Sequence, residues 1–178
     1  LPAERMTTVY ETLERPLLPV IVDMEQAGIK VDPAILLRLS SQFAQSITRL
    51  EEEVQTLAAP ATGGQRFNLG SPKQLGELLF DTLKLPGGKK TKTGQWETRA
   101  SLLDDLAANE ELPDDARKLI NTMLEWRQLS KLRSTYTDAL PGFINAGSGR
   151  IHTSYALAAT TTGRLASSDP NLQNIPIR

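Results

Sequence analysis

Hydrophobic residues recur at steps of three and four along much of this chain, which is the period of an amphipathic helix. The pattern predicts helices over residues 15–28, 33–57, 71–79, 102–106 and 113–136. The longest repeat runs through Leu36, Leu39, Phe43, Ile47, Leu50, Val54 and Leu57. At a rise of 1.5 Å per residue, that helix would be about 40 Å long.

Local signals mark where these helices begin and end. Asp32-Pro33 and Ser71-Pro72 each place a capping side chain before a proline, the order expected at a helix start. Gly28 is placed as a C-terminal stop for the first helix. Residues 58–70 are predicted as a loop, and residues 86–95, with three lysines and no apolar side chain, as a mobile exposed loop tip.

A different pattern begins after Gly149. The segment RIHTSYALA is rich in β-branched and aromatic residues, and it alternates so that Ile151, Thr153 and Tyr155 share one side of a strand. The sequence therefore predicts an α+β protein that is mainly α with a small β part. The length suits one domain, or one domain plus a piece of another, and the helices before Pro141 and the strand-and-turn segment after Gly149 are expected to be different units.

Composition narrows the classes of function. The 178 residues include no cysteine and one histidine, which excludes disulfides and the common zinc sites. The longest apolar run, Pro16–Val22, is far shorter than the roughly 20 residues of a membrane span. We expect a cytoplasmic protein that does not bind membranes. Twenty basic and twenty-one acidic residues give a net charge of −1, so binding to a polyanion would need locally concentrated positive charge.

The helix over residues 113–136 changes character along one face. Its first half carries the apolar residues Leu119, Ile120 and Met123. Two turns later the same face carries the stripe Arg127, Ser130, Lys131 and Ser134. A solvated helix face explains such a stripe, and so does a phosphate backbone, for which Lys and Arg supply charge and Ser a short donor.

Two further places suit phosphate. Lys89, Lys90 and Lys92 sit on the glycine-flanked loop tip, where they either solubilise a flexible loop or track a nucleic-acid backbone. The helix start at Ser71 offers free N–H groups, as every helix start does.

The carboxylates occur as neighbours in sequence and are interpreted as solvated faces. His152 is interpreted as structural. No catalytic residue and no metal ligand is predicted in this chain.

The closing stretch, TTTGRLASSDPNLQNIPIR, is dense in hydrogen-bond donors and contains one acid, Asp169. Its donors are Arg164, Asn171, Gln173, Asn174 and Arg178. The minor groove of a DNA duplex presents acceptors at every base pair, so Arg, Asn and Gln can bind there without reading sequence. A polar surface loop remains the alternative.

Five stretches carry a resemblance to a known family. They are FNLGSPKQL, EWRQLSKLRSTY, STYTDALP, GRIHTSY and the closing TTTGRLASSDPNLQNIPIR. Together they resemble the bacterial DNA polymerase I family, the family A DNA polymerases, from about residue 15 to residue 178. The resemblance implies that residues 1–140 are the thumb, a domain of long antiparallel helices that grips primer-template DNA, with a lysine-rich tip at 86–99. Residues 141–178 would begin the palm.

The resemblance also implies roles for single residues. Thumb positions that meet the duplex are matched by Ser71, Lys89, Lys90, Lys92, Arg127, Lys131 and Ser134. Arg164 matches a palm arginine at the minor groove of the primer terminus, and the neighbouring DNA contacts are matched by Asn171, Gln173, Asn174 and Arg178. Two positions depart from the family pattern: Glu97 replaces a small hydroxyl residue, and Ala166 a common serine.

The aspartates with which the family binds metal would lie beyond Arg178. We therefore expect a monomeric fragment of a DNA-directed DNA polymerase that holds DNA but lacks the catalytic carboxylates. Magnesium and deoxynucleoside triphosphates would belong to the full-length enzyme, and no cofactor to this fragment. The alternative from the residues alone is a helical interaction module whose long heptad helix docks a protein partner.

Overall fold

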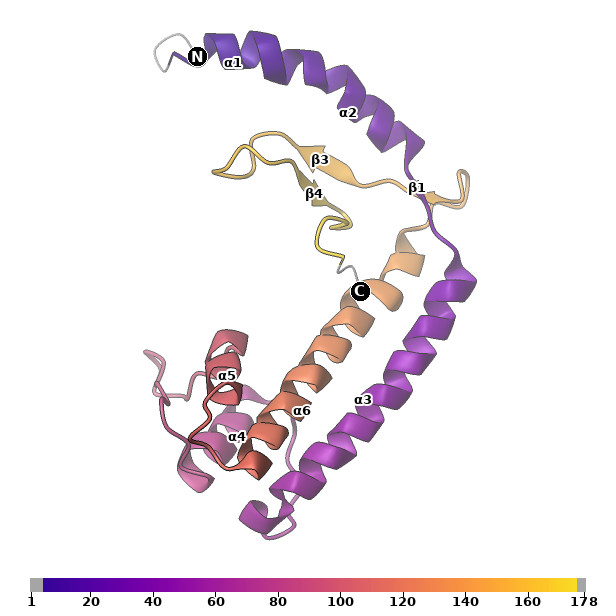
Figure 1. Ribbon diagram of the computed structural model, residues 1–178. Coiled ribbons are helices and arrows are strands. Elements are labelled where there is room, and N and C mark those ends of the chain that lie inside the picture. Colours follow the sequence, from indigo (N-terminus) through magenta and orange to yellow (C-terminus); the bar gives the residue numbers. More distant parts are fainter. Residues whose placement is uncertain (1–4, 176–178) are drawn as a thin grey trace. The chain divides into compact units, whose positions relative to one another are not determined.

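The computed structural model describes residues 5–175, and the chain divides into two compact units (Figure 1). The central unit consists of residues Ser40–Arg133. The terminal unit combines Leu1–Leu39 with Ser134–Arg178. The predicted boundary near residue 140 was drawn between a thumb and a palm, and that assignment stays a prediction.

Helices dominate the central unit. They are α3 (Pro33–Thr62, which starts in the terminal unit), α4 (Pro72–Gly76), the π-helical η2 (Glu77–Thr82), α5 (Ala100–Ala107) and α6 (Asp114–Leu132). Asp32 caps α3 as predicted, since its carboxylate accepts the backbone N–H of Ala34 at 2.9 Å. Ser71 likewise caps α4.

Helix α6 lies antiparallel to the part of α3 that belongs to the central unit (Figure 1). Arg133, just beyond the end of α6, lies 3.3 Å from the hydroxyl of Ser40 near the start of α3. Lys118 in the first turns of α6 lies 3.3 Å from Glu53, far along α3. These two contacts at opposite ends confirm the long antiparallel helices that the resemblance implies.

The core of the central unit forms where α3, α4, η2, α5 and α6 meet. Its most completely buried side chains include Val54, Leu75, Leu79, Leu103, Ile120 and Met123. Each such side chain is worth about 1.5–3 kcal/mol relative to leaving it in water. Of the predicted α3 stripe, Leu50 and Val54 are fully buried and the other members are half-buried.

The predicted loop over residues 58–70 is wrong at its start, because α3 continues to Thr62 through Pro60. Ala58 in this last stretch is buried in the core, so packing holds the helix past the position where proline removes a backbone donor. Gly63 and Gly64, both with positive φ, then end it.

The terminal unit begins with α1 (Thr7–Val9), the π-helical η1 (Tyr10–Glu14) and α2 (Arg15–Ala27). Two short antiparallel strand pairs follow: β1 (Ile29–Lys30) with β2 (Arg150–Ile151), and β3 (Ser154–Ala156) with β4 (Ala166–Ser168). Two short helices precede β2 in the chain: the π-helical η3 (Arg133–Thr137) and the 3-10 helix η4 (Leu140–Phe143). The mainly α fold with a small β part is therefore confirmed.

The predicted alternation after Gly149 is also confirmed, since Ile151 and Thr153 are buried and Tyr155 is half-buried. His152, on the other side, places Nδ1 2.7 Å from the carbonyl of Glu25 and Nε2 2.7 Å from the hydroxyl of Ser148. A nitrogen that faces a carbonyl must carry the proton, so Nδ1 donates to the Glu25 carbonyl. Both ring nitrogens therefore serve structural contacts. Among the described residues, no helix is both long and apolar enough to cross a membrane.

Candidate nucleic-acid interface

The three predicted lysines lie on a paired turn in the central unit, here called the lysine hairpin (Lys89–Glu97). The N–H of Glu97 donates to the carbonyl of Lys89 at 2.8 Å, and the N–H of Thr91 donates to that of Gln95 at 2.7 Å. Gly94 adopts a φ of +79°, which a tight turn requires and other residues rarely adopt. The sequence indicated only a mobile tip, whereas the structure shows a hydrogen-bonded hairpin.

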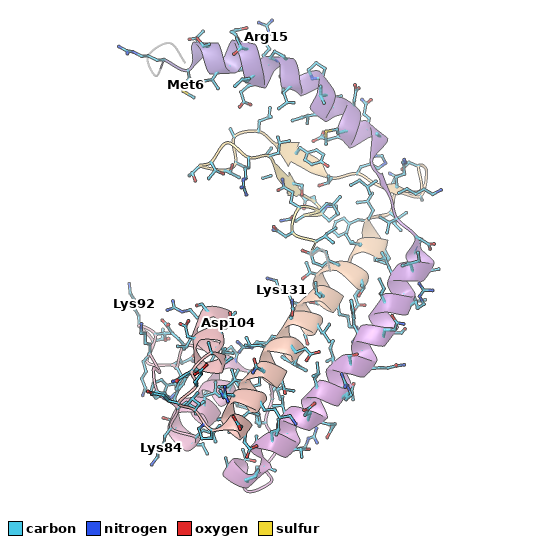
Figure 2. All side chains as sticks on the ribbon, in the orientation of Figure 1. Met6, Arg15, Lys84, Lys92, Asp104 and Lys131 are labelled. Carbon is cyan, nitrogen blue, oxygen red and sulfur yellow. The ribbon has the colours of Figure 1, made fainter. Side chains whose placement is uncertain are left out.

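All three lysine side chains of this hairpin are exposed. Figure 2 shows Lys92 projecting from its tip. Lys90 differs from the other two, because its ammonium lies 4.7 Å from the centre of the Trp96 ring, within the range of a cation–π interaction. The hairpin thus presents three positive charges to solvent, one of them held by an aromatic ring.

Trp96 connects the lysine hairpin to the core and was not singled out from the sequence. Its indole N–H donates to the carboxylate of Asp81 at 2.9 Å, and its ring lies 5.0 Å from that of Phe80. The available signal was a lone tryptophan in the polar stretch TGQWETR, a residue type that usually finds apolar surface for its ring and a partner for its N–H.

Arg127 has a different role from the one its spacing suggested. It is half-buried, and its guanidinium donates to the backbone carbonyl of Thr98 and lies 3.3 Å from the Thr98 hydroxyl. Burial lowers the pKa of Arg127 from its ordinary value. A fully solvated face, one of the two explanations left open for the stripe, therefore does not hold at Arg127, because this side chain fastens α6 to the segment before α5. Its contact with DNA stays a prediction.

The remaining members of the predicted stripe differ in their exposure to solvent. Lys131 is exposed on α6 (Figure 2), and Ser130 beside it is half-buried with its hydroxyl out of contact with solvent. Ser134 is exposed on η3, where the helix changes to π-type hydrogen bonding, and it belongs to the terminal unit. Of these candidates in the central unit, Lys131 is the one that presents charge to solvent.

The helix start at Ser71 is satisfied by its own neighbourhood. The N–H of Gln74 donates to the Ser71 hydroxyl at 3.5 Å, and the N–H of Gly70 donates to the Asn68 side chain at 2.8 Å. Pro72 has no N–H to offer. The donors that the sequence assigned to phosphate at this end are thus largely used within the loop, and the DNA contact of Ser71 stays a prediction.

In the terminal unit, Gln173 shapes the closing segment. Its side-chain oxygen accepts the N–H of Ser167 at 3.1 Å, and its side-chain nitrogen donates to the carbonyl of Leu165 at 2.5 Å. The oxygen of the Asn171 side chain accepts the N–H of Gln173 at 3.0 Å. Both ends of the Gln173 amide therefore hold the segment against β4, while Asn171 keeps its amide nitrogen as a donor.

Arg164 and Asn174 are exposed. Arg164 follows a turn at Gly163, whose φ is +72°, and its carbonyl accepts the hydroxyl of Thr160 at 2.8 Å. Within residues 5–175, no side chain or backbone group accepts a hydrogen bond from the Arg164 guanidinium or the Asn174 amide. Their donors therefore face solvent. The remaining candidate, Arg178, lies outside the described residues.

No group of three or more Asp, Glu, His or Cys side chains comes together in the described part of the chain.

The family model of DNA polymerase family A matches residues 33–178, which is most of the chain. The chain belongs to DNA polymerase family A. It is 59% identical, over its whole length, to DNA polymerase I of Rhizobium leguminosarum, and 46% identical over 98% of its length to the thermostable DNA polymerase I of Thermus aquaticus. It spans 16% and 20% of the lengths of these two family A proteins.

Among solved structures, the chain is similar to the POL domain of Pol1 from M. smegmatis, described in complex with a DNA primer-template and dNTP. The TM-score is 0.77 at 37% identity, over 96% of this chain and 28% of that one. The family A fold of this segment is therefore established by sequence and by structure.

Proposed function

We propose that this segment holds primer-template DNA within a polymerase that carries out template-directed DNA synthesis. The observation that carries the proposal is the concentration of exposed donors in two short stretches of a family A chain whose net charge is only −1. One stretch is the lysine hairpin, and the other is the closing segment with Arg164 and Asn174.

The two stretches suit different parts of a duplex. Lysine ammonium groups neutralise backbone phosphates and release counterions, which gives affinity without sequence preference. The minor groove presents acceptors at every base pair. Neutral or positive donors that can meet them come from Arg164, Asn174 and the amide nitrogen of Asn171. A polymerase must move over any sequence, so donors of this kind fit the task.

The similar POL domain of M. smegmatis Pol1, a complex with a DNA primer-template and dNTP, supports DNA as the partner. We assign nucleotide binding and magnesium-dependent chemistry to other parts of a full-length enzyme, because the family resemblance places the metal-binding aspartates beyond Arg178. In this view the chain acts as a monomer next to the bacterial chromosome in the cytoplasm.

The experiment is a titration of fluorescently labelled primer-template DNA, read by anisotropy, with the chain and three charge-removing variants: Lys90→Gln, Lys131→Gln and Arg164→Gln. Each variant should weaken binding. The matched control is Lys84→Gln, which removes an exposed charge of the central unit outside the lysine hairpin and should bind as the unsubstituted chain does. Equal binding by all five proteins would contradict the proposal and favour a module that docks another protein.

A further inference from the structure

We propose that Trp96 is a positioning residue of the DNA grip, which holds the ammonium of Lys90 in place before DNA arrives. This inference rests on the proposed function and adds to it. It assigns unequal roles to three lysines that look equivalent in the sequence.

The indole of Trp96 is fixed from several sides within the central unit. Asp81 accepts its N–H at 2.9 Å, and the ring of Phe80 packs against it with the centroids 5.0 Å apart. A Cβ added to Gly76 would lie 2.5 Å from the Trp96 Cβ, and one added to Gly88 would lie 2.6 Å from a Phe80 ring carbon. Glycine at both positions therefore leaves just enough room for the two rings.

Lys90 is held against this fixed ring. Lys90 and Trp96 form an antiparallel bridge across the hairpin, and the ammonium lies 4.7 Å from the ring centre. The attraction comes from the negative face of the indole and uses no lone pair, so the N–H groups of Lys90 remain able to donate to a phosphate. Among the described residues, neither ring nor carboxylate holds Lys89 or Lys92 in this way.

A held lysine should bind phosphate better than an unheld one. A lysine side chain has many rotamers, and the entropy lost when it is immobilised on a ligand reduces affinity. Because Trp96 already restricts Lys90, less freedom is lost when Lys90 meets the backbone. Lys90 should therefore contribute more to DNA affinity than Lys89, although both are exposed on the same hairpin.

The test is a double-mutant cycle on the affinity of the 178-residue chain for labelled primer-template DNA, with Trp96→Leu, Lys90→Ala and the double variant. Trp96→Leu should weaken binding about threefold, the size expected for loss of one exposed cation–π contact. In the Lys90→Ala background, Trp96→Leu should have little further effect. Trp96→Phe, which keeps a π face, should bind nearly as the unsubstituted chain does, and Lys89→Ala should lose less affinity than Lys90→Ala.

Thermal unfolding of each variant shows whether a loss of DNA affinity reflects a loss of stability. Trp96→Phe and Trp96→Leu both lose the hydrogen bond to Asp81, so a difference in DNA affinity between them reports on the π face of the ring. Additive losses in the double variant, or equal losses for Phe and Leu at position 96, would overturn the inference and leave the DNA grip standing. Unchanged binding in the Lys89, Lys90 and Arg164 variants would instead overturn the proposed function, and this inference with it.

Discussion

The guanidinium of Arg127 donates to the backbone carbonyl of Thr98, 29 positions earlier in the chain. This contact ties the middle of α6 to the segment that leads from the lysine hairpin into α5. A residue whose spacing suggested a surface charge is therefore part of the framework that supports the hairpin.

Replacing Arg127 should first affect stability. Arg127→Ala leaves the Thr98 carbonyl without its donor in a half-buried setting, which should lower the free energy of unfolding by about 1–3 kcal/mol in a urea titration. Thr98→Val, which removes only the hydroxyl 3.3 Å from the guanidinium, should cost less. If Arg127→Ala weakened DNA binding with no change in unfolding, Arg127 would act as a DNA contact and not as a fastening.

Glu97 should weaken the grip at the end of the lysine hairpin. It lies 3.7 Å from Arg99, and one of its carboxylate oxygens is buried without a hydrogen bond. Glu97→Ser removes a negative charge close to where phosphate would bind, so DNA affinity at low salt should rise about twofold. Glu97→Gln serves as the control of similar shape and should show most of the same gain; unchanged or weaker binding by both variants would refute this role.

Gly28 is the most constrained turn position of the terminal unit. Its φ is +61°, and an added Cβ would lie 2.8 Å from both the His152 ring and the carbonyl oxygen of Ile151. With a ψ of −178°, Gly28 adopts a backbone conformation that essentially only glycine takes, so Gly28→Ala should cost more than the roughly 1–3 kcal/mol of that conformation alone. Gly149→Ala is the matched control, since its φ is +65° and nothing lies within 4 Å of the added atom. Equal losses of stability in the two variants would show that the contact with His152 relaxes freely.

The isolated chain should not extend a primer. We expect no incorporation of nucleotides when it is mixed with primer-template DNA, the four deoxynucleoside triphosphates and magnesium, because the proposed function assigns the metal-binding aspartates to other parts of a full-length enzyme. Resolution of the products on a denaturing gel is sufficient. Template-directed extension above a no-protein control would disprove this expectation.

Much of the framework follows from local patterns, because periodicity reports which face of a helix is apolar. The buried positions Val54, Ile120 and Met123 were predicted in this way. The cap at Asp32 was predicted from a capping residue that stands before a proline. Local spacing does not report which polar group reaches across to another segment. The hydrogen bond from Arg127 to the Thr98 carbonyl was therefore seen only in the structure.

The candidate site shows the same limit. The exposure of Lys90 and Arg164 was predictable from polar, glycine-containing stretches. Two other contacts depend on residues that only folding brings together. Gln173 holds Ser167 and Leu165, and Trp96 holds Lys90. Residue type alone suggests Gln173 as a donor to DNA, which stays a prediction, and does not reveal that its amide also holds the segment itself.

The central claim is that this segment binds DNA through charge, and the salt dependence of binding tests it most directly. If about four phosphates are neutralised, a plot of log affinity against log salt concentration should have a slope of about −3.6, and Lys90→Gln should make it shallower by about 0.9. Binding that does not change with salt, or no binding even at low salt, would contradict the account.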